Sequence, residues 1–507
     1  MNRARHLLQS SLIVIVLFGL DKLLGLLRTQ LVGETFGTSP AFDAFTAANQ
    51  LPEVFVTLVS GGALAAAFIP VYSAYLNSPR AREAARLANA TITLVLIILS
   101  IISAIGAILA PWLVSNYLAS GFSPELQTLT ADLMRIILVQ TTIFGVSGVL
   151  SSILNAHQHF VLPALAPMAL HIGYLFGLFF LVPEMGIYGL AWGTVVGGLL
   201  HILIQVPGLR RYRFHFRPVL GLKMTGIQEI ARLMGPRIVT LGTVQIADLF
   251  IINITSGLAS GSTSGYFFGY YLQQLPETLF GTAIAIVVFP TLAEYFNAGR
   301  IKEMVRTAIN TLHIIWWLTI PTAALLILLG RPAIVVFLER GEFTPESTAV
   351  VYGVLVFFSL RVVSEATLEI LARLFYAQHN TRTPMFVALL WLVIAVGLSY
   401  LLVAFLGLGG LALASSIAFT VQVIVLYFLL RRKLGDMGDR ESLLALGRAT
   451  VATIGMGIVV FLVLRPLANP WAQLVIGGGV GVAVYLLLSR LLGGREISQL
   501  IALVRNR

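Results

Sequence analysis

The sequence contains no cysteine and very little charge. Of its 507 residues only 11% are Asp, Glu, Lys or Arg, whereas 58% are hydrophobic. Soluble domains carry about 25% charged residues, so this composition excludes a water-soluble protein. Without cysteine the chain can form neither a disulfide nor a thiolate. What remains is a long apolar chain with room for many membrane-crossing helices of roughly 20 residues each.

Motifs of common enzyme classes are also missing. The chain has neither a GxxxxGK[ST] phosphate-binding loop nor an HExxH zinc motif. Its DxxD pair, Asp436 and Asp439, stands in a polar loop and is too isolated to predict a metal site for a prenyl diphosphate. We therefore expect no catalytic residue, no metal and no cofactor.

What the sequence does have is an internal repeat. Residues 70–80, PVYSAYLNSPR, recur as residues 290–300, PTLAEYFNAGR. At almost the same spacing, Gly186 and Arg210 correspond to Gly407 and Arg431. An apolar chain that repeats itself over this length is typical of a transporter built from two related halves.

Apolar stretches bounded by glycine, proline and charge predict fourteen membrane spans. Several are longer than a crossing requires, so tilting is expected. Pro52 and Pro70 fall inside the second span, and Pro276 and Pro290 inside the eighth, where each can bend its helix. The predicted spans are 8–33, 42–76, 87–115, 126–156, 161–182, 186–207, 226–258, 263–297, 304–328, 345–377, 384–406, 409–431, 443–464 and 471–491.

The net charge of +11 would suit a nucleic-acid ligand, but its location argues against one. Most Lys and Arg residues stand in alternate short loops between apolar runs, which is the positive-inside pattern of a multi-pass membrane protein. The opposite loops hold Arg331, Arg340 and Arg465. We therefore predict that both termini are cytoplasmic and that nucleic acid is not a partner.

The repeat predicts the domain organisation of an all-α integral membrane protein. Residues 1–210 form an N-terminal lobe of six spans, 211–225 a cytoplasmic linker and 226–432 a C-terminal lobe of six spans. Because six spans return the chain to its starting side, the two repeats are expected to be parallel. Residues 433–507 add two spans and a cytoplasmic tail.

Charged residues within the spans are the candidate functional residues, because each costs at least about 2.5–3.5 kcal/mol at mid-bilayer. In the first span Asp21 and Arg28 are seven residues apart and share one helix face, with Lys22 beside them. We expect Lys22 and Arg28 to line a hydrated cavity and bind an anionic head group. Asp43, at the start of the second span, is expected at the rim or gate. Alternatively, Asp21, Lys22 and Arg28 neutralise one another in a packed bundle.

Four further residues are candidates for gating or coupling. Asp248 in the seventh span could bind a proton or a metal cation, or form a hydrogen bond to a neighbouring helix. Glu53, Gln274 and Glu277 belong to the duplicated QLPE motif, where a symmetric structural role is the simpler interpretation.

Other charges in the spans have the spacing of intrahelical ion pairs. Asp132 and Arg135 are three residues apart, and Arg361, Glu365 and Glu369 follow at intervals of four. We expect these residues to pair within their own helices.

Five segments along the chain carry a resemblance to a known family: LLGLLRTQLVGETFG (23–37), FDAFTAANQLPEVF (42–55), GGALAAAFIPVYSAYL (61–76), LASGSTSGYFFGYYLQQLPETLFGTAIAIVVFPTLAEYF (258–296) and FYAQHNTRTP (375–384). In order and spacing they resemble the MurJ (MviN) family, over essentially the whole chain. The family consists of lipid II flippases of the multidrug/oligosaccharidyl-lipid/polysaccharide exporter superfamily.

The resemblance implies a bacterial inner-membrane flippase that moves lipid II, the undecaprenyl-diphosphate-linked peptidoglycan precursor, by alternating access. It implies two six-helix lobes forming a V around a cationic cavity, and a groove for the lipid tail at the last two spans. Arg28 matches the family's cavity Arg and Asp43 its acid at the start of the second span. Lys22 takes a position usually held by Arg. Coupling to a cation or to the membrane potential is left open.

The chain departs from the family pattern at other positions of that cavity. The basic residue expected in the second span falls near Val56, and the Arg and acid expected in the eighth fall near Tyr271 and Gln274. A flippase for another polyprenyl-linked oligosaccharide is therefore an alternative. A cation exporter would need more acidic residues in the cavity, and a membrane-embedded glycosyl- or prenyl-transferase would need clustered carboxylates in cytoplasmic loops.

Overall fold

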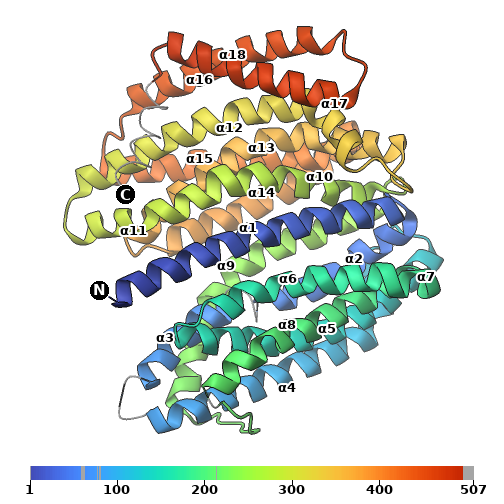
Figure 1. The fold of residues 1–507 in the computed structure, drawn as a ribbon, viewed down its shortest axis with the longest axis vertical. Coiled ribbons are helices and arrows are strands. Elements are labelled where there is room, and N and C mark those ends of the chain that lie inside the picture. The colour runs from blue at the N-terminus through green and yellow to red at the C-terminus, as the bar shows by residue number, and fades with distance from the viewer. Residues whose placement is uncertain (1, 59–62, 77, 79–80, 213, 495–507) are drawn as a thin grey trace. The chain divides into compact units, whose positions relative to one another are not determined.

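The computed structural model describes residues 2–58, 63–76, 78, 81–212 and 214–494, and these residues are organised almost entirely as helices (Figure 1). They form two compact units, Met1–Thr263 and Ser264–Arg507. Helices suit the hydrocarbon core of a bilayer, because a helix satisfies its backbone hydrogen bonds internally.

The described part of the N-terminal unit consists of α-helices with short π-helical segments. Within it α5 lies between α4 and α8, and α6 packs along α8 (Figure 1). Its elements are α1 (Asn2–Phe36), α2 (Pro40–Val56), α3 (Ala63–Leu76), α4 (Ala81–Leu113), η2 (Val114–Leu118), α5 (Pro124–Ala156), α6 (Val161–Phe176), η3 (Gly177–Leu181), α7 (Val182–Met185), α8 (Ile187–Arg211) and α9 (Thr225–Ser256).

The C-terminal unit follows, with α13 packed between α12 and α15, and α16 packed on α12 and α18 (Figure 1). Its elements are α10 (Ser262–Glu277), η4 (Thr278–Thr282), α11 (Ala283–Asn297), α12 (Ile301–Phe337), α13 (Pro345–Ala377), α14 (Arg382–Leu406), α15 (Leu408–Leu434), α16 (Asp439–Leu464), α17 (Pro470–Ala472), η5 (Gln473–Gly477) and α18 (Gly478–Leu491).

The predicted spans fall on helices or on runs of helices wherever the structure describes them; residues 59–62 of the span 42–76 lie outside the described residues. Eleven helices of the described chain are long and apolar enough to cross a membrane, and Leu64–Leu76 and Leu241–Ser256 are shorter apolar helices. The multi-pass membrane architecture is therefore confirmed, while the exact number of fourteen crossings stays a prediction.

Three helices begin with a hydroxyl N-cap followed by proline. The side chains of Ser39, Ser123 and Thr344 accept hydrogen bonds from backbone amides of the first turns of α2, α5 and α13. Proline at the first helical position loses no hydrogen bond and has a suitable φ. A local sequence signal thus sets the start of these helices.

The internal repeat is visible in backbone conformation. Gly186 has φ 57° and ψ −139° before α8, and Gly407 has φ 54° and ψ −136° before α15. The left-handed residues Gln158 and His379, with φ of 58° and 56°, are related by the same spacing. Because non-glycine residues rarely adopt positive φ, this agreement confirms that the two sequence repeats fold alike locally.

The two QLPE motifs also share a helical irregularity. Pro52 lies inside α2 and residues 57–58 are π-helical, while Pro276 lies inside α10 and is followed by the π-helical η4. Proline removes one backbone hydrogen bond, and a π-turn re-forms the pattern with one extra residue. The predicted interruption of both helices is thus present, directly after Glu277 and one turn after Glu53.

Helix α9 follows the linker in sequence but packs on the N-terminal unit. It contacts α2, α3 and α4, and Asn253 in α9 donates hydrogen bonds to the Tyr117 carbonyl (2.7 Å) and the Ser120 hydroxyl (2.9 Å). The compact units therefore separate after Thr263, whereas the repeats of the sequence separate at residues 211–225. The two divisions differ by this one helix.

We predict that Gly410→Ala destabilises the protein by roughly 1–3 kcal/mol. A Cβ atom on Gly410 would lie 2.3 Å from the Leu402 carbonyl oxygen, in backbone that cannot move aside cheaply. Gly397→Ala in α14 is the control, because its Cβ would meet nothing within 4 Å. Thermal unfolding of the purified protein in detergent measures both, and equal midpoints would contradict the prediction.

Candidate functional site

The charged face of α1 packs on α6. Asp21 Oδ1 lies 3.3 Å from His171 Nε2, and the guanidinium of Arg28 stacks over the Tyr174 ring at 4.7 Å. A Cβ atom on Gly25, between them, would touch the His171 ring at 3.4 Å. The prediction that Asp21 and Arg28 share one helix face is confirmed, since both side chains contact α6.

The two predicted cations of α1 differ in exposure. The Lys22 side chain is exposed, and Arg28 is half-buried. Arg28 also lies near enough to Glu53 in α2 for the two charges to interact. Neither side chain is fully buried, and their role as ligands of an anionic head group stays a prediction.

Asp43 is the most buried of the predicted N-terminal candidates, with 2% exposure. Its Oδ2 accepts a 2.6 Å hydrogen bond from the backbone amide of Gly261, in the turn between α9 and α10. Gly261 has φ +86°, and a Cβ there would lie 2.6 Å from the Thr38 carbonyl oxygen. Asp43 therefore ties the start of α2 to the end of α9, a contact worth about 1.5–3 kcal/mol for a charged acceptor.

Two other candidates in this unit lie apart from Asp43. Glu53 is exposed, and Asp248 in α9 is half-buried and has an interaction partner. The structure does not gather these acids with Asp21 and Asp43 into one acidic cluster: within the described residues, no group of three or more His, Asp or Glu residues could hold a metal ion.

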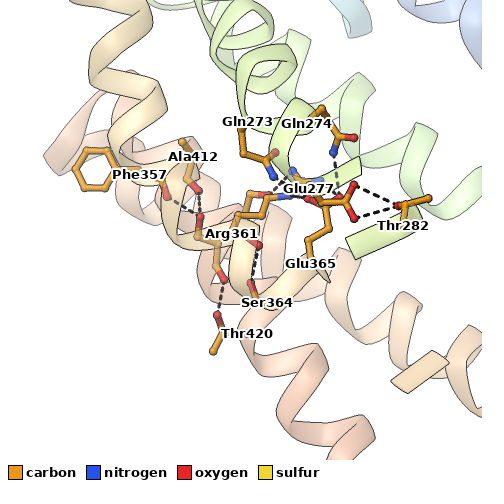
Figure 2. Close-up of polar contacts among 12 residues, drawn as sticks. Gln273, Gln274, Glu277, Thr282, Phe357, Arg361, Ser364, Glu365, Ala412 and Thr420 are labelled. Atoms are coloured by element: carbon orange, nitrogen blue, oxygen red, sulfur yellow. Dashed lines mark hydrogen bonds and ion pairs between the residues drawn. The ribbon is translucent and has the colours of Figure 1, made fainter. Parts of the chain in front are cut away.

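The C-terminal unit holds a buried ion pair between Arg361 and Glu365 of α13. Arg361 Nε and Nη2 each lie 3.0 Å from a different carboxylate oxygen of Glu365, which is a two-pronged pair (Figure 2). Arg361 is 7% exposed and donates a third hydrogen bond to the Ser415 hydroxyl at 3.0 Å. The predicted intrahelical pairing is confirmed here, as it is for Asp132 and Arg135 at 2.7 Å. Glu369 pairs instead with Arg373, one helical turn further along.

Helix α10 contributes two more side chains to this pair (Figure 2). Gln273 donates to Glu365 Oε2 at 3.1 Å, and Gln274 donates to Glu365 Oε1 at 3.2 Å. The neighbouring Glu277 is 3% exposed and accepts a hydrogen bond from the Thr282 hydroxyl of η4 at 3.1 Å. The predicted candidate Gln274 thus links α10 to α13, whereas the hydrogen bond of Glu277 goes to the helix interruption that follows it.

Aromatic rings enclose the Arg361 guanidinium. Its central carbon lies 4.2 Å from the Phe419 ring centroid, 5.1 Å from that of Tyr270 and 5.7 Å from that of Phe358. Cation–π contacts of this kind contribute about 0.5–2 kcal/mol, and more when they are desolvated. The rings and the carboxylate together allow a full charge to remain inside an apolar bundle.

Sequence reasoning missed the link between α10 and α13. Helical spacing pairs residues of the same helix, and it already paired Arg361 with Glu365. It therefore gave no reason to look for partners on another helix. The signal for the missing partners was the Gln273–Gln274 pair in an otherwise apolar segment, because buried amides need hydrogen-bond partners.

Two histidines in the loop after α5 have a lowered pKa. Burial lowers the pKa of His157, whose ring stacks on Tyr212 at 4.3 Å between centroids. Burial and the nearby positive charge of Arg211 lower the pKa of His159. Both rings are therefore neutral at pH 7 and add no charge to this loop.

A double-mutant cycle tests the buried pair. Removing either Arg361 or Glu365 alone leaves a buried charge without its counterion, and we expect a loss of about 3–5 kcal/mol for Arg361→Met or Glu365→Leu. The double variant should lose clearly less than the two single losses added together. Unfolding midpoints in detergent measure the cycle, and strict additivity would contradict the coupling.

Comparisons with known proteins agree with this architecture. The family model described as lipid II flippase MurJ matches residues 32–476. The lipid II flippase MurJ of Burkholderia cenocepacia is 26% identical over 422 residues, covering 82% of each chain.

Solved structures share the fold. One titled lipid II flippase MurJ, inward closed conformation, has a TM-score of 0.82 at 24% identity and covers 95% of this chain and 98% of that one. A multidrug resistance MATE family transporter of the MOP superfamily, solved in an inward-facing conformation, has a TM-score of 0.69 at 15% identity and covers 84% and 99%. The chain is therefore a membrane transporter rather than an enzyme, and it belongs to the MurJ family of lipid II flippases.

Proposed function

We propose that this chain carries lipid II from the cytoplasmic to the outer leaflet of the bacterial inner membrane by alternating access. The observation that carries the proposal is the family match over residues 32–476, which includes most of the charged segments described above. The diphosphate sugar head of lipid II cannot cross hydrocarbon unaided, because desolvating its charges costs far too much.

Arg28 is the proposed diphosphate ligand, supported by Lys22. Stacking on Tyr174 uses the flat face of the guanidinium, at 4.7 Å. The N–H donors lie in the guanidinium plane, so this contact leaves their geometry suited to gripping two phosphate oxygens. The exposed ammonium of Lys22 would add a point charge that follows the head group.

Asp43 and Asp21 are proposed to position α1 and the neighbouring helices for this ligand. The Asp43 bond to Gly261 and the Asp21 contact with His171 each fix the end or the face of a helix. Asp43 also acts as a gate in this proposal, since breaking one hydrogen bond would release the turn between α9 and α10.

The remaining candidates are proposed to couple or gate the movement. Glu277 and Gln274 stand where α10 is interrupted by a π-turn; Gln274 bonds to Glu365, and Glu277 bonds to Thr282 in the π-turn. Glu53 occupies the equivalent place in the first repeat, near Arg28. A change of proton or cation at these residues, or at Asp248, would alter polar contacts near the two helix interruptions.

The proposed topology follows the charge pattern. Both termini lie in the cytoplasm, residues 1–210 and 226–432 act as the two lobes, and residues 433–507 supply two helices that accompany the lipid tail. The exposed apolar side chains of α16 and α18 support contact with lipid, for example Leu443 and Val482, at 69% and 52% exposure.

A second candidate substrate is another polyprenyl-diphosphate-linked oligosaccharide. The Arg that the family pattern places in the eighth span falls near Tyr271, which is 48% exposed, and the acid that follows it falls near Gln274, which is bonded to Glu365. A less basic environment would suit a smaller or less charged head group.

We predict that Arg28→Ala abolishes growth complementation of a flippase-depleted strain and weakens lipid II binding to the purified protein roughly 100-fold, as the loss of a two-pronged charged contact implies. The lipid II affinity of Arg28→Lys should lie between those of the wild type and Arg28→Ala. Lysine keeps the positive charge but lacks the paired N–H donors of the guanidinium.

Arg135→Ala is the matched control, because Arg135 is an exposed arginine paired within α5. It should complement normally. If Arg28→Ala complements as well as this control while reaching the membrane at the same level, the role assigned to Arg28 is wrong. Binding of a different polyprenyl-linked oligosaccharide in preference to lipid II would favour the second substrate.

A further inference from the structure

The C-terminal unit contains a cavity of ≈ 780 Å³ between the first turns of α12, the turn after α15 and the first half of α16. Three cations line it: Lys302 and Arg306 from α12, and Arg448 from α16. None of them belongs to the candidate site around Arg28 or to the network around Arg361.

The α12 wall of the cavity is a polar stripe. Lys302, Arg306, Asn310 and His313 recur at helical spacing and all line the cavity. Lys302 and Arg306 are exposed at its mouth, whereas His313 is buried and lies 3.1 Å from the Ser442 hydroxyl through its Nε2. The stripe therefore runs from solvent into the bundle.

The α16 wall brings the third cation inside. Arg448 lies nine residues beyond the start of α16 at Asp439, which is about 13 Å along the helix. It is half-buried, and its Nη1 donates to the Gly493 carbonyl at 3.3 Å. An arginine at this depth of an apolar helix marks a functional site by default.

The acids of the cavity balance this charge only in part. Asp436 Oδ1 accepts hydrogen bonds from the amides of Gly438 and Asp439, at 3.0 and 3.3 Å, so it is engaged in shaping the turn. Glu441 is exposed at the rim. Lys302, Arg306 and Arg448 thus line one space together, and an anion held there would be attracted to all three.

The first repeat shows what fills the equivalent place. The repeated segments 70–80 and 290–300 end directly before α4 and α12, so the starts of these helices correspond. On α4, the linker covers this face: Asn89 Nδ2 donates to the His215 carbonyl at 3.3 Å, and the Val219 amide donates to Thr93 Oγ1 at 3.1 Å.

In the second repeat the corresponding connection is short. Residues 212–224 join α8 to α9, but only residues 435–438 join α15 to α16. The shorter connection lines the cavity with Asp436, Met437 and Gly438 and leaves space beside the stripe of α12. Within the described residues, this face is therefore open to a ligand.

The lining also has an apolar part, which includes Val305, Ile309 and Leu444. Leu444 is 56% exposed, and Val451 and Ile458 of the same helix are each 57% exposed, as expected of a helix that faces lipid. A ligand with an anionic head and a hydrocarbon tail would satisfy both parts of the lining. Basic pockets of this kind between membrane helices bind lipid head groups.

We propose that this cavity binds the phosphate group of an anionic phospholipid, with Arg306 and Arg448 as the phosphate ligands and Lys302 as a supporting charge. Such a lipid would contact both α12 and α16 and stabilise their packing. The proposal concerns a site separate from substrate transport, so it does not depend on the identity of the carried lipid.

The test compares ligands on the purified full-length chain in detergent, by binding titration with phosphatidylglycerol, phosphatidylcholine of the same acyl chains, and inorganic phosphate. We expect phosphatidylglycerol to bind roughly tenfold more tightly than phosphatidylcholine. Arg448→Gln and Arg306→Gln should each lower that affinity roughly tenfold, the effect of one charged hydrogen bond. Arg432→Gln, an exposed arginine of α15 outside the cavity lining, should leave it unchanged.

The proposal is overturned if phosphatidylglycerol has no advantage over phosphatidylcholine, or if Arg306→Gln and Arg432→Gln behave alike. Binding of millimolar inorganic phosphate with the same arginine dependence, but without binding of phosphatidylglycerol, would assign the cavity to a soluble phosphate and overturn the lipid. Because Arg306 is exposed at the mouth, its variant decides the question even if Arg448→Gln does not fold.

Discussion

A charged side chain inside an apolar helix must be paired, caged or hydrated, and this constraint organises the whole molecule. Arg361 meets it with a carboxylate and three aromatic rings, and Asp43 meets it with the Gly261 amide. Arg28 is satisfied differently, since it is half-buried and stacked on one ring. Its environment supports a cation that can exchange partners, which a carrier of anionic lipids requires.

Much of the fold could be predicted because membrane burial leaves strong marks in sequence. Apolar runs predicted where the helices lie. The duplication paired Gly186 with Gly407, and the two residues have nearly equal backbone angles. The packing of α9 could not be predicted in this way. The sequence repeat assigns α9 to the second repeat, whereas its contacts are with helices of the first.

The candidate sites were predictable only where partners are close in sequence. The Arg361–Glu365 pair follows from helical spacing, but its links to Gln273 and Gln274 join residues roughly ninety positions apart. Likewise, no local pattern connects Asp43 with Gly261 or Asp21 with His171. Arg448 was recognisable as an intramembrane charge, while the cavity it shares with Arg306 depends on how α16 packs on α12.

The most direct test of the central claim is a leaflet-accessibility assay for lipid II in cells whose only lipid II flippase is this chain. Newly made lipid II should become accessible at the outer leaflet when the wild-type chain is present, and should stay inaccessible when Arg28 is replaced by alanine. Equal accessibility with the wild-type chain and the alanine variant, at equal protein levels, would contradict the role of Arg28. Inaccessible lipid II with a well-expressed wild-type chain would contradict lipid II transport itself.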